Sequence, residues 1–253
     1  MRRGCRFPNR YVRRAVEYGV DDARQNGRGT ALANILYDGR LGIIIGNWNG
    51  YHRAYVPARH SFLDYATEAF REPSLVRTVI SADFDNDGFD EIFFNNIVQP
   101  NRMFRVRDGG VLESVALSAA LEADGLGTGA AVADIDGDGV LDLLVAHGES
   151  APQPLSLFRA AIDGPGRYLR VAPLTGQGAP ARGATVILET DMRVHAKTID
   201  AGSGYLCQME PVAHYGLRDG ETVKSVKVRW TDGTETGLGE MAENKTHIIR
   251  KDG

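Results

Sequence analysis

The chain has 253 residues, of which 43% are hydrophobic and 25% charged, and its formal net charge is -4. This length is enough for one large or two ordinary domains, and the small negative charge does not indicate a nucleic-acid-binding protein. No run of about 18 apolar residues is present, so the sequence predicts no membrane span. Two cysteines, Cys5 and Cys207, are too few for a disulfide framework.

The stretch from Met1 to Arg14 is rich in arginine and lacks the apolar run of a secretory signal. After it, three segments resemble one another. Each begins with small and β-branched residues, passes through a glycine-containing turn and ends in a short apolar run. The segments are Gly29 to Asn49, Thr78 to Ile97 and Gly129 to Gly148.

The turns of these segments begin at Asn34, Asp83 and Asp134, which are 49 and 51 residues apart. A shorter similarity follows each segment, at residues 52–56, 101–105 and 154–159. A period near 50 residues built from short strands is typical of β-propeller blades, one blade per repeat. The apolar runs are too short and too rich in Ile, Val and Phe for a helical solenoid.

The second and third turns are acidic and follow the pattern D-x-D-x-D-G-x-x-[DE]. Alternating carboxylates repel one another unless a hard cation lies between them, and glycine at position six allows the chain to turn sharply around it. We therefore expect two Ca²⁺ sites, with side-chain oxygens from positions one, three, five and nine and the carbonyl of position seven. The expected ligands are Asp83, Asp85, Asp87, Phe89 and Glu91 in one loop, and Asp134, Asp136, Asp138, Val140 and Asp142 in the other.

Two other interpretations of these turns are weaker. An EF-hand needs glutamate at position twelve, where this chain has Phe94 and Val145 in strand-like runs. A plain hairpin turn explains the Asp-Gly pairs but not the other carboxylates. The first turn, residues 34–42, has Leu36 at position three and Gly42 at position nine, so it is predicted to keep its shape without metal.

The chain beyond the glycine-containing linker at residues 164–166 also favours strands. Ala184 to Leu188 is one, and Val226 to Trp230 alternates apolar and basic residues before the turn-forming pair Asp232-Gly233. We predict an all-β chain, with a partial β-propeller of about three blades in residues 1–163 and a small β-sandwich-like domain in residues 164–253.

The acidic loops resemble the FG-GAP or VCBS repeats of integrin-α-like propellers. The C-terminal part contains four further motifs: Ala181-Arg182-Gly183-Ala184, Gly202-Ser203-Gly204-Tyr205-Leu206-Cys207-Gln208-Met209-Glu210-Pro211, His214-Tyr215-Gly216-Leu217 and Trp230-Thr231-Asp232-Gly233. With these motifs it resembles the ASPIC/UnbV domain, and the combination of the two parts is similar to the cartilage acidic protein family.

This resemblance implies a secreted, calcium-binding protein of the extracellular matrix or cell surface, with a protein or matrix partner of unknown identity. It also implies a propeller of about seven blades. Three visible repeats and the lack of a signal peptide therefore indicate an N-terminally truncated member of the family. If the chain is secreted, the triplet Asn244-Lys245-Thr246 is a glycosylation site and the protein a glycoprotein.

Two other functions remain open at this stage. One is a metal-dependent enzyme or a carbohydrate-binding protein that uses the propeller face, and the other is an inactive fragment of a longer propeller. The six histidines show no zinc-binding spacing, and no G-x-S-x-G motif is present. His147 and Glu149 are the best catalytic candidates, but binding rather than catalysis is the prediction.

Overall fold

A computed structural model describes residues 12–160, 162, 164, 166–200, 202 and 205–252. Cys5, most of the arginine-rich N-terminus and parts of the linker and of the glycine motif at 202–204 lie outside these residues. The described residues form eighteen strands, two short α-helices and two 3-10 turns. The helical elements are α1 (Ala15–Tyr18), α2 (Glu68–Arg71), η1 (Asp108–Gly110) and η2 (Ser118–Leu121). The predicted all-β fold is confirmed, and no described helix is long and apolar enough to cross a membrane.

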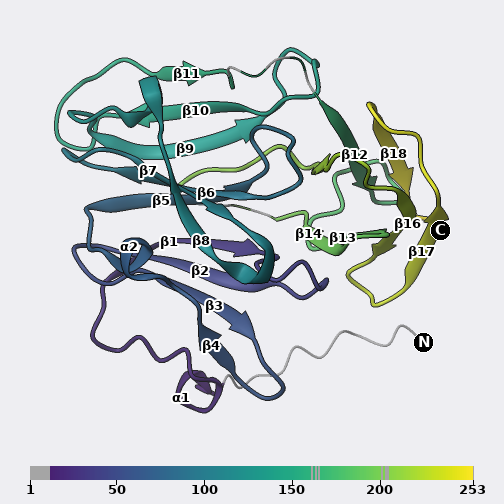
Figure 1. Ribbon diagram of the computed structural model, residues 1–253, viewed down its shortest axis with the longest axis horizontal. Coiled ribbons are helices and arrows are strands. Elements are labelled where there is room, and N and C mark those ends of the chain that lie inside the picture. Colours follow the sequence, from purple (N-terminus) through teal and green to yellow (C-terminus); the bar gives the residue numbers. More distant parts are fainter. Residues whose placement is uncertain are drawn as a thin grey trace.

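The strands form five small sheets (Figure 1). Three are antiparallel meanders that follow one another along the chain and match the three sequence repeats. The first contains β1 (Gly27–Ala33), β2 (Gly42–Asn47), β3 (Arg53–Pro57) and β4 (Phe62–Asp64). The second contains β5 (Val76–Ala82), β6 (Glu91–Asn96), β7 (Arg102–Val106) and β8 (Leu112–Val115). The third contains β9 (Gly127–Ala133), β10 (Asp142–His147) and β11 (Ser156–Phe158).

The other two sheets lie in the C-terminal part of the chain and have a less local topology. One has the order β15-β12-β18, in which β12 and β18 are parallel and far apart in sequence, and the other has the order β14-β13-β16-β17. Their strands are β12 (Arg167–Leu174), β13 (Thr185–Thr190), β14 (Val194–Thr198), β15 (Ala213–Leu217), β16 (Val223–Arg229), β17 (Glu235–Gly239) and β18 (Thr246–Arg250). The turn predicted at Asp232-Gly233 joins β16 to β17, where Gly233 has φ 85°.

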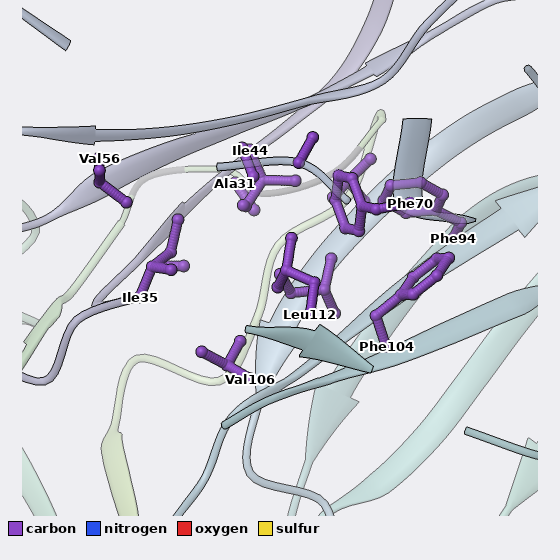
Figure 2. Close-up of a cluster of buried hydrophobic side chains, with 14 of the residues drawn as sticks. Ala31, Ile35, Ile44, Val56, Phe70, Phe94, Phe104, Val106 and Leu112 are labelled. Carbon is purple, nitrogen blue, oxygen red and sulfur yellow. The ribbon is translucent and has the colours of Figure 1, made fainter. Parts of the chain in front are cut away.

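The buried side chains fall into three clusters. One lies between the first two meanders and includes the aromatic group of Phe70, Phe94 and Phe104 (Figure 2). The ring centroids of Phe70 and Phe104 are 4.8 Å apart. The second cluster lies between the second and third meanders, and the third fills the C-terminal part. Burial of each large apolar side chain contributes about 1.5–3 kcal/mol, so the packing of successive meanders against each other stabilises this part of the fold.

Equivalent positions on β2, β6 and β10 show that the outer face of the third meander is not covered by another meander within the described residues. Ile44 and Phe93 are fully buried, because each packs between its own meander and the next. Leu144, at the same place on the third meander, is 37% exposed, and its cross-strand neighbour Leu157 is 56% exposed. The sequence predicted about three blades, and the structure has five small sheets because residues 167–250 supply two more. The predicted boundary near residue 164 stays a prediction.

Candidate metal centres

The two acidic loops join β5 to β6 and β9 to β10, and they repeat one hydrogen-bond pattern. The first aspartate accepts a backbone N–H from the glycine at position six, Gly88 to Asp83 Oδ2 at 3.0 Å and Gly139 to Asp134 Oδ2 at 3.1 Å. These glycines have φ 84° and 86°, a conformation that side chains disfavour. The acids at positions three and five each accept the N–H two residues ahead, which curls the carboxylates inward.

The acid at position nine closes each loop. Glu91 accepts the N–H of Phe84 and Asp142 accepts that of Ile135, both at 3.0 Å. Carboxylate oxygens of Asp83, Asp85 and Glu91 lie within 4.8 Å of one another, and so do those of Asp134, Asp136 and Asp138. The structure thus brings three predicted ligands together in each loop. Asp87 and Asp142 lie outside these two groups, and the carbonyl roles of Phe89 and Val140 stay predictions.

One oxygen in each loop lacks a partner. Asp83 Oδ1 and Asp134 Oδ1 are buried without a hydrogen bond, although the second oxygen of each carboxylate is bonded. The side chain of Asp134 is 2% exposed and Asp83 is fully buried. A buried anionic oxygen without a donor is costly, and a hard cation is the partner that relieves the cost. The donor set of both loops therefore fits Ca²⁺.

An arginine in or directly after the neighbouring strand reaches each loop. Arg105, opposite Glu91 on β7, contacts Glu91 at 2.7 Å and also pairs with Asp85 and Asp87. Arg159, which follows β11, pairs with Asp136 at 2.7 Å and also with Asp138. Both arginines end the short similarity that follows each repeat. The sequence therefore contains a signal for these two residues, but the pattern of the acidic loops alone does not reveal it.

Burial raises the pKa of Asp83 to about 8, and the nearby charges of Asp90, Asp87 and Asp85 act in the same direction. Burial likewise raises the pKa of Glu91 to about 9, with Asp83 and Asp85 contributing. Asp90 behaves oppositely: burial opposes its charge, but Lys197 at 2.8 Å and His195 hold its pKa well below the usual range. Asp83 and Glu91 thus favour their protonated forms when no cation is bound, so cation binding at the first loop would release protons.

The first turn differs from the two acidic loops. Asp38 pairs with Arg40 at the surface, and Gly42 stands where the other loops have an acid. Within the described residues, this turn forms no group of three metal-ligating side chains. Its Asn34 instead donates to the carbonyl of Val194 at 3.0 Å. The turn therefore contacts the C-terminal part of the chain through ordinary hydrogen bonds.

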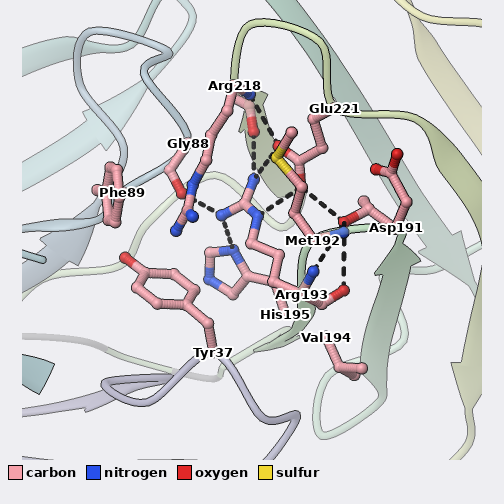
Figure 3. A network of polar contacts seen from close by, with 12 residues as sticks. Tyr37, Gly88, Phe89, Asp191, Met192, Arg193, Val194, His195, Arg218 and Glu221 are labelled. Atoms are coloured by element: carbon pink, nitrogen blue, oxygen red, sulfur yellow. Dashed lines mark hydrogen bonds and ion pairs between the residues drawn. The ribbon is translucent and has the colours of Figure 1, made fainter. Parts of the chain in front are cut away.

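The C-terminal part also packs directly on both acidic loops, which the sequence did not indicate. Gly216 on β15 donates its N–H to Asp83 Oδ2 at 2.9 Å, and Arg170 on β12 donates to Asp134 Oδ2 at 2.6 Å. Figure 3 shows Arg193 between Gly88, His195 and Glu221. Arg193 donates to the carbonyls of Gly88 and Gly216 and pairs with Glu221 at 2.7 Å. Buried polar contacts therefore join the C-terminal part to the first loop and to Asp134 of the second loop.

The catalytic candidates do not form a joint site. His147 contacts Glu122 at 3.2 Å, whereas Glu149 pairs with Arg77 at 2.5 Å. Two residues of the C-terminal motif 214–217 are likewise engaged: His214 stacks on Tyr168 with ring centroids 6.0 Å apart, and the hydroxyl of Tyr215 donates to the carbonyl of Val186. These side chains pack and hydrogen-bond within the fold.

Two family models match the chain: an FG-GAP-like repeat at residues 83–145 and ASPIC and UnbV at residues 174–253. Cartilage acidic protein 1 from Mus musculus is 48% identical over 252 residues, which is 94% of this chain and 39% of that protein. The resemblance to the cartilage acidic protein family is confirmed. The Homo sapiens protein of the same name is 51% identical and the Xenopus tropicalis one 49%, each over 88% of this chain and 36% of the relative. The chain thus spans little more than a third of the relatives it matches.

Proposed function

We propose that this chain is a calcium-binding interaction module of the extracellular matrix or cell surface, in which Ca²⁺ has a structural role in two propeller loops. One observation carries the proposal: both acidic loops hold a buried aspartate oxygen without a partner, surrounded by further carboxylates. The ligands we propose are the ten residues expected from the sequence. The match to FG-GAP-like repeats over residues 83–145 supports this assignment.

The structural role follows from the position of the loops between strands. Each loop connects two strands of one meander, and its carboxylates repel one another when no cation is bound. Extracellular calcium modules often have dissociation constants of about 10⁻⁴ to 10⁻³ M. At ten times such a constant, each site stabilises the fold by about 1.4 kcal/mol.

The extracellular location and a matrix partner are proposed from the relatives, whose name is cartilage acidic protein 1. Glycosylation is part of the same proposal. Asn244 is exposed, and its side-chain oxygen accepts the N–H of Tyr168 at 3.0 Å. A division near residue 164 is supported by the separate core cluster of the C-terminal part and by the ASPIC and UnbV match that begins at residue 174. We propose binding rather than catalysis.

Isothermal titration with CaCl₂ tests the proposal. Wild type should bind two ions, and Asp85→Ala combined with Asp136→Ala should bind none, because each change removes a carboxylate from the middle of a loop. Asp38→Ala in the first turn is the matched control and should leave both ions bound. Wild-type binding that survives the double substitution, or no binding at millimolar Ca²⁺, would overturn the assignment.

A further inference from the structure

The side chain of Asn86, at position four of the first loop, contacts the second acidic loop. Its Nδ2 donates to the carbonyl of Gly139 in the second loop at 2.8 Å. Gly139 is the position-six glycine whose N–H bonds to Asp134. The side chain of Asn86 therefore joins the turn of one candidate calcium site to the turn of the other.

The same side chain also reaches the C-terminal part of the chain. Asn86 Oδ1 accepts from His214 Nε2 on β15 at 2.6 Å. Asn86 is 4% exposed and has φ 60°, a conformation that asparagine tolerates better than most residues. One buried amide thus contacts both loops and the C-terminal part.

Gly216, two residues after His214, makes the docking very close. A Cβ atom at Gly216 would lie 2.3 Å from Asp83 Oδ2 and 2.5 Å from the backbone of Asn86. Only glycine allows β15 to approach the first loop and donate its N–H to Asp83. The geometry of the first loop and the seating of β15 are therefore mutually dependent.

From this arrangement we propose that Asn86 is a positioning residue that couples the two calcium loops to each other and to the docked C-terminal part. The inference rests on the proposed function, because it requires the loops to bind Ca²⁺. Calcium that fixes the first loop would hold Asp83 and Asn86 where β15 needs them. By thermodynamic linkage, a docked β15 would strengthen calcium binding by the same factor.

The sequence offers a matched pair of substitutions for the test. Position four of the second loop is Gly137, which has φ 77°, and a Cβ atom there would have nothing within 4 Å. Asn86→Gly therefore removes the bridging amide, keeps the backbone conformation and copies a natural loop. Gly137→Asn makes the reverse change at a site without neighbours and serves as the control.

The experiment measures hydrogen exchange of the amides in residues 213–217 with 5 mM CaCl₂ or excess EGTA, beside calorimetric calcium titration. In wild type and Gly137→Asn, calcium should slow this exchange by about tenfold, within the usual range of coupling between sites. The variant Asn86→Gly should still bind two ions, but calcium should slow the exchange of these amides by less than about threefold in it. Gly216→Ala should weaken calcium binding about tenfold, whereas Gly237→Ala, at an open position in the same part, should not.

The outcomes separate this inference from the proposed function. If wild type and Asn86→Gly both bind two ions and show the same protection of residues 213–217, the coupling role is wrong and the calcium assignment stands. If Asn86→Gly loses an ion, Asn86 is required for binding itself and the positioning role is wrong. If wild type binds no calcium, both proposals fail.

Discussion

Replacing Asp83 with asparagine should produce opposite effects without and with calcium. Asn keeps the shape of the side chain, and its oxygen can still accept the N–H groups of Gly88 and Gly216. Its amide group replaces the buried oxygen that has no partner. The substitution therefore removes the titratable carboxyl group from the loop while leaving the backbone contacts in place.

The sign of the calcium-free effect follows from the raised pKa of Asp83. The native pKa is about 8, above the usual 3.8, so between these values the native state binds the proton more tightly than the unfolded chain. The Asp83 carboxylate consequently opposes folding at pH 7, and stability falls as the pH rises through this window. Asp83→Asn should raise the free energy of unfolding in EGTA by on the order of 2–4 kcal/mol.

With calcium, Asp83→Asn should lose the contribution of the first site. At ten times the dissociation constant that loss is about 1.4 kcal/mol, or about 3–6 °C in melting temperature for a chain of this size. Urea denaturation and thermal unfolding, each with EGTA and with CaCl₂, give both quantities, and Asp38→Asn in the first turn, where no metal site is predicted, is the control. Two results would refute the reasoning. One is that calcium stabilises Asp83→Asn as much as wild type, and the other is that Asp83→Asn has a free energy of unfolding in EGTA more than about 1 kcal/mol below that of wild type.

Two further predictions concern buried polar groups outside the loops. His52 accepts the N–H of Asn47 at 3.0 Å, and burial lowers its pKa to about 3, so its stabilising contribution is complete above about pH 6.5 and is lost as the pH falls toward 3. The variant His52→Asn copies the equivalent residue Asn101, which accepts the N–H of Asn96. Between pH 7 and pH 4, wild type should lose on the order of 2–3 kcal/mol more free energy of unfolding than this variant, measured by urea denaturation at both pH values. Equal losses in the two proteins would contradict this. Arg193→Met should cost about 3–5 kcal/mol because it leaves Glu221 buried and unpaired, and adding Glu221→Gln should restore at least about 1 kcal/mol in the same assay. A double variant no more stable than Arg193→Met would show that the charge of Glu221 is not the cause.

Local patterns in the sequence predicted the parts of this structure that depend on neighbouring residues. The turn spacing located the three meanders, and the D-x-D-x-D-G pattern located both loops, because strand alternation and glycine turns act over a few residues. Glu91 and Asp142 begin strands β6 and β10, as their place at position nine indicated.

Long-range contacts could not be predicted in this way. The bond from Gly216 to Asp83 joins residues 133 positions apart, and Arg193 reaches Gly88 across 105 positions. No local pattern in a single sequence specifies which strand docks against a loop. The same limit applies to the parallel pairing of β12 with β18, which depends on how the C-terminal part closes around its own core.

The most direct test of the calcium assignment is thermal unfolding of wild type and of Asp85→Ala combined with Asp136→Ala, each in CaCl₂ and in excess chelator. Calcium should raise the melting temperature of wild type by about 6–12 °C, from two sites of about 1.4 kcal/mol each, and should leave the double variant unchanged. Equal melting temperatures of wild type in calcium and in chelator would show that the acidic loops are turns without a structural metal.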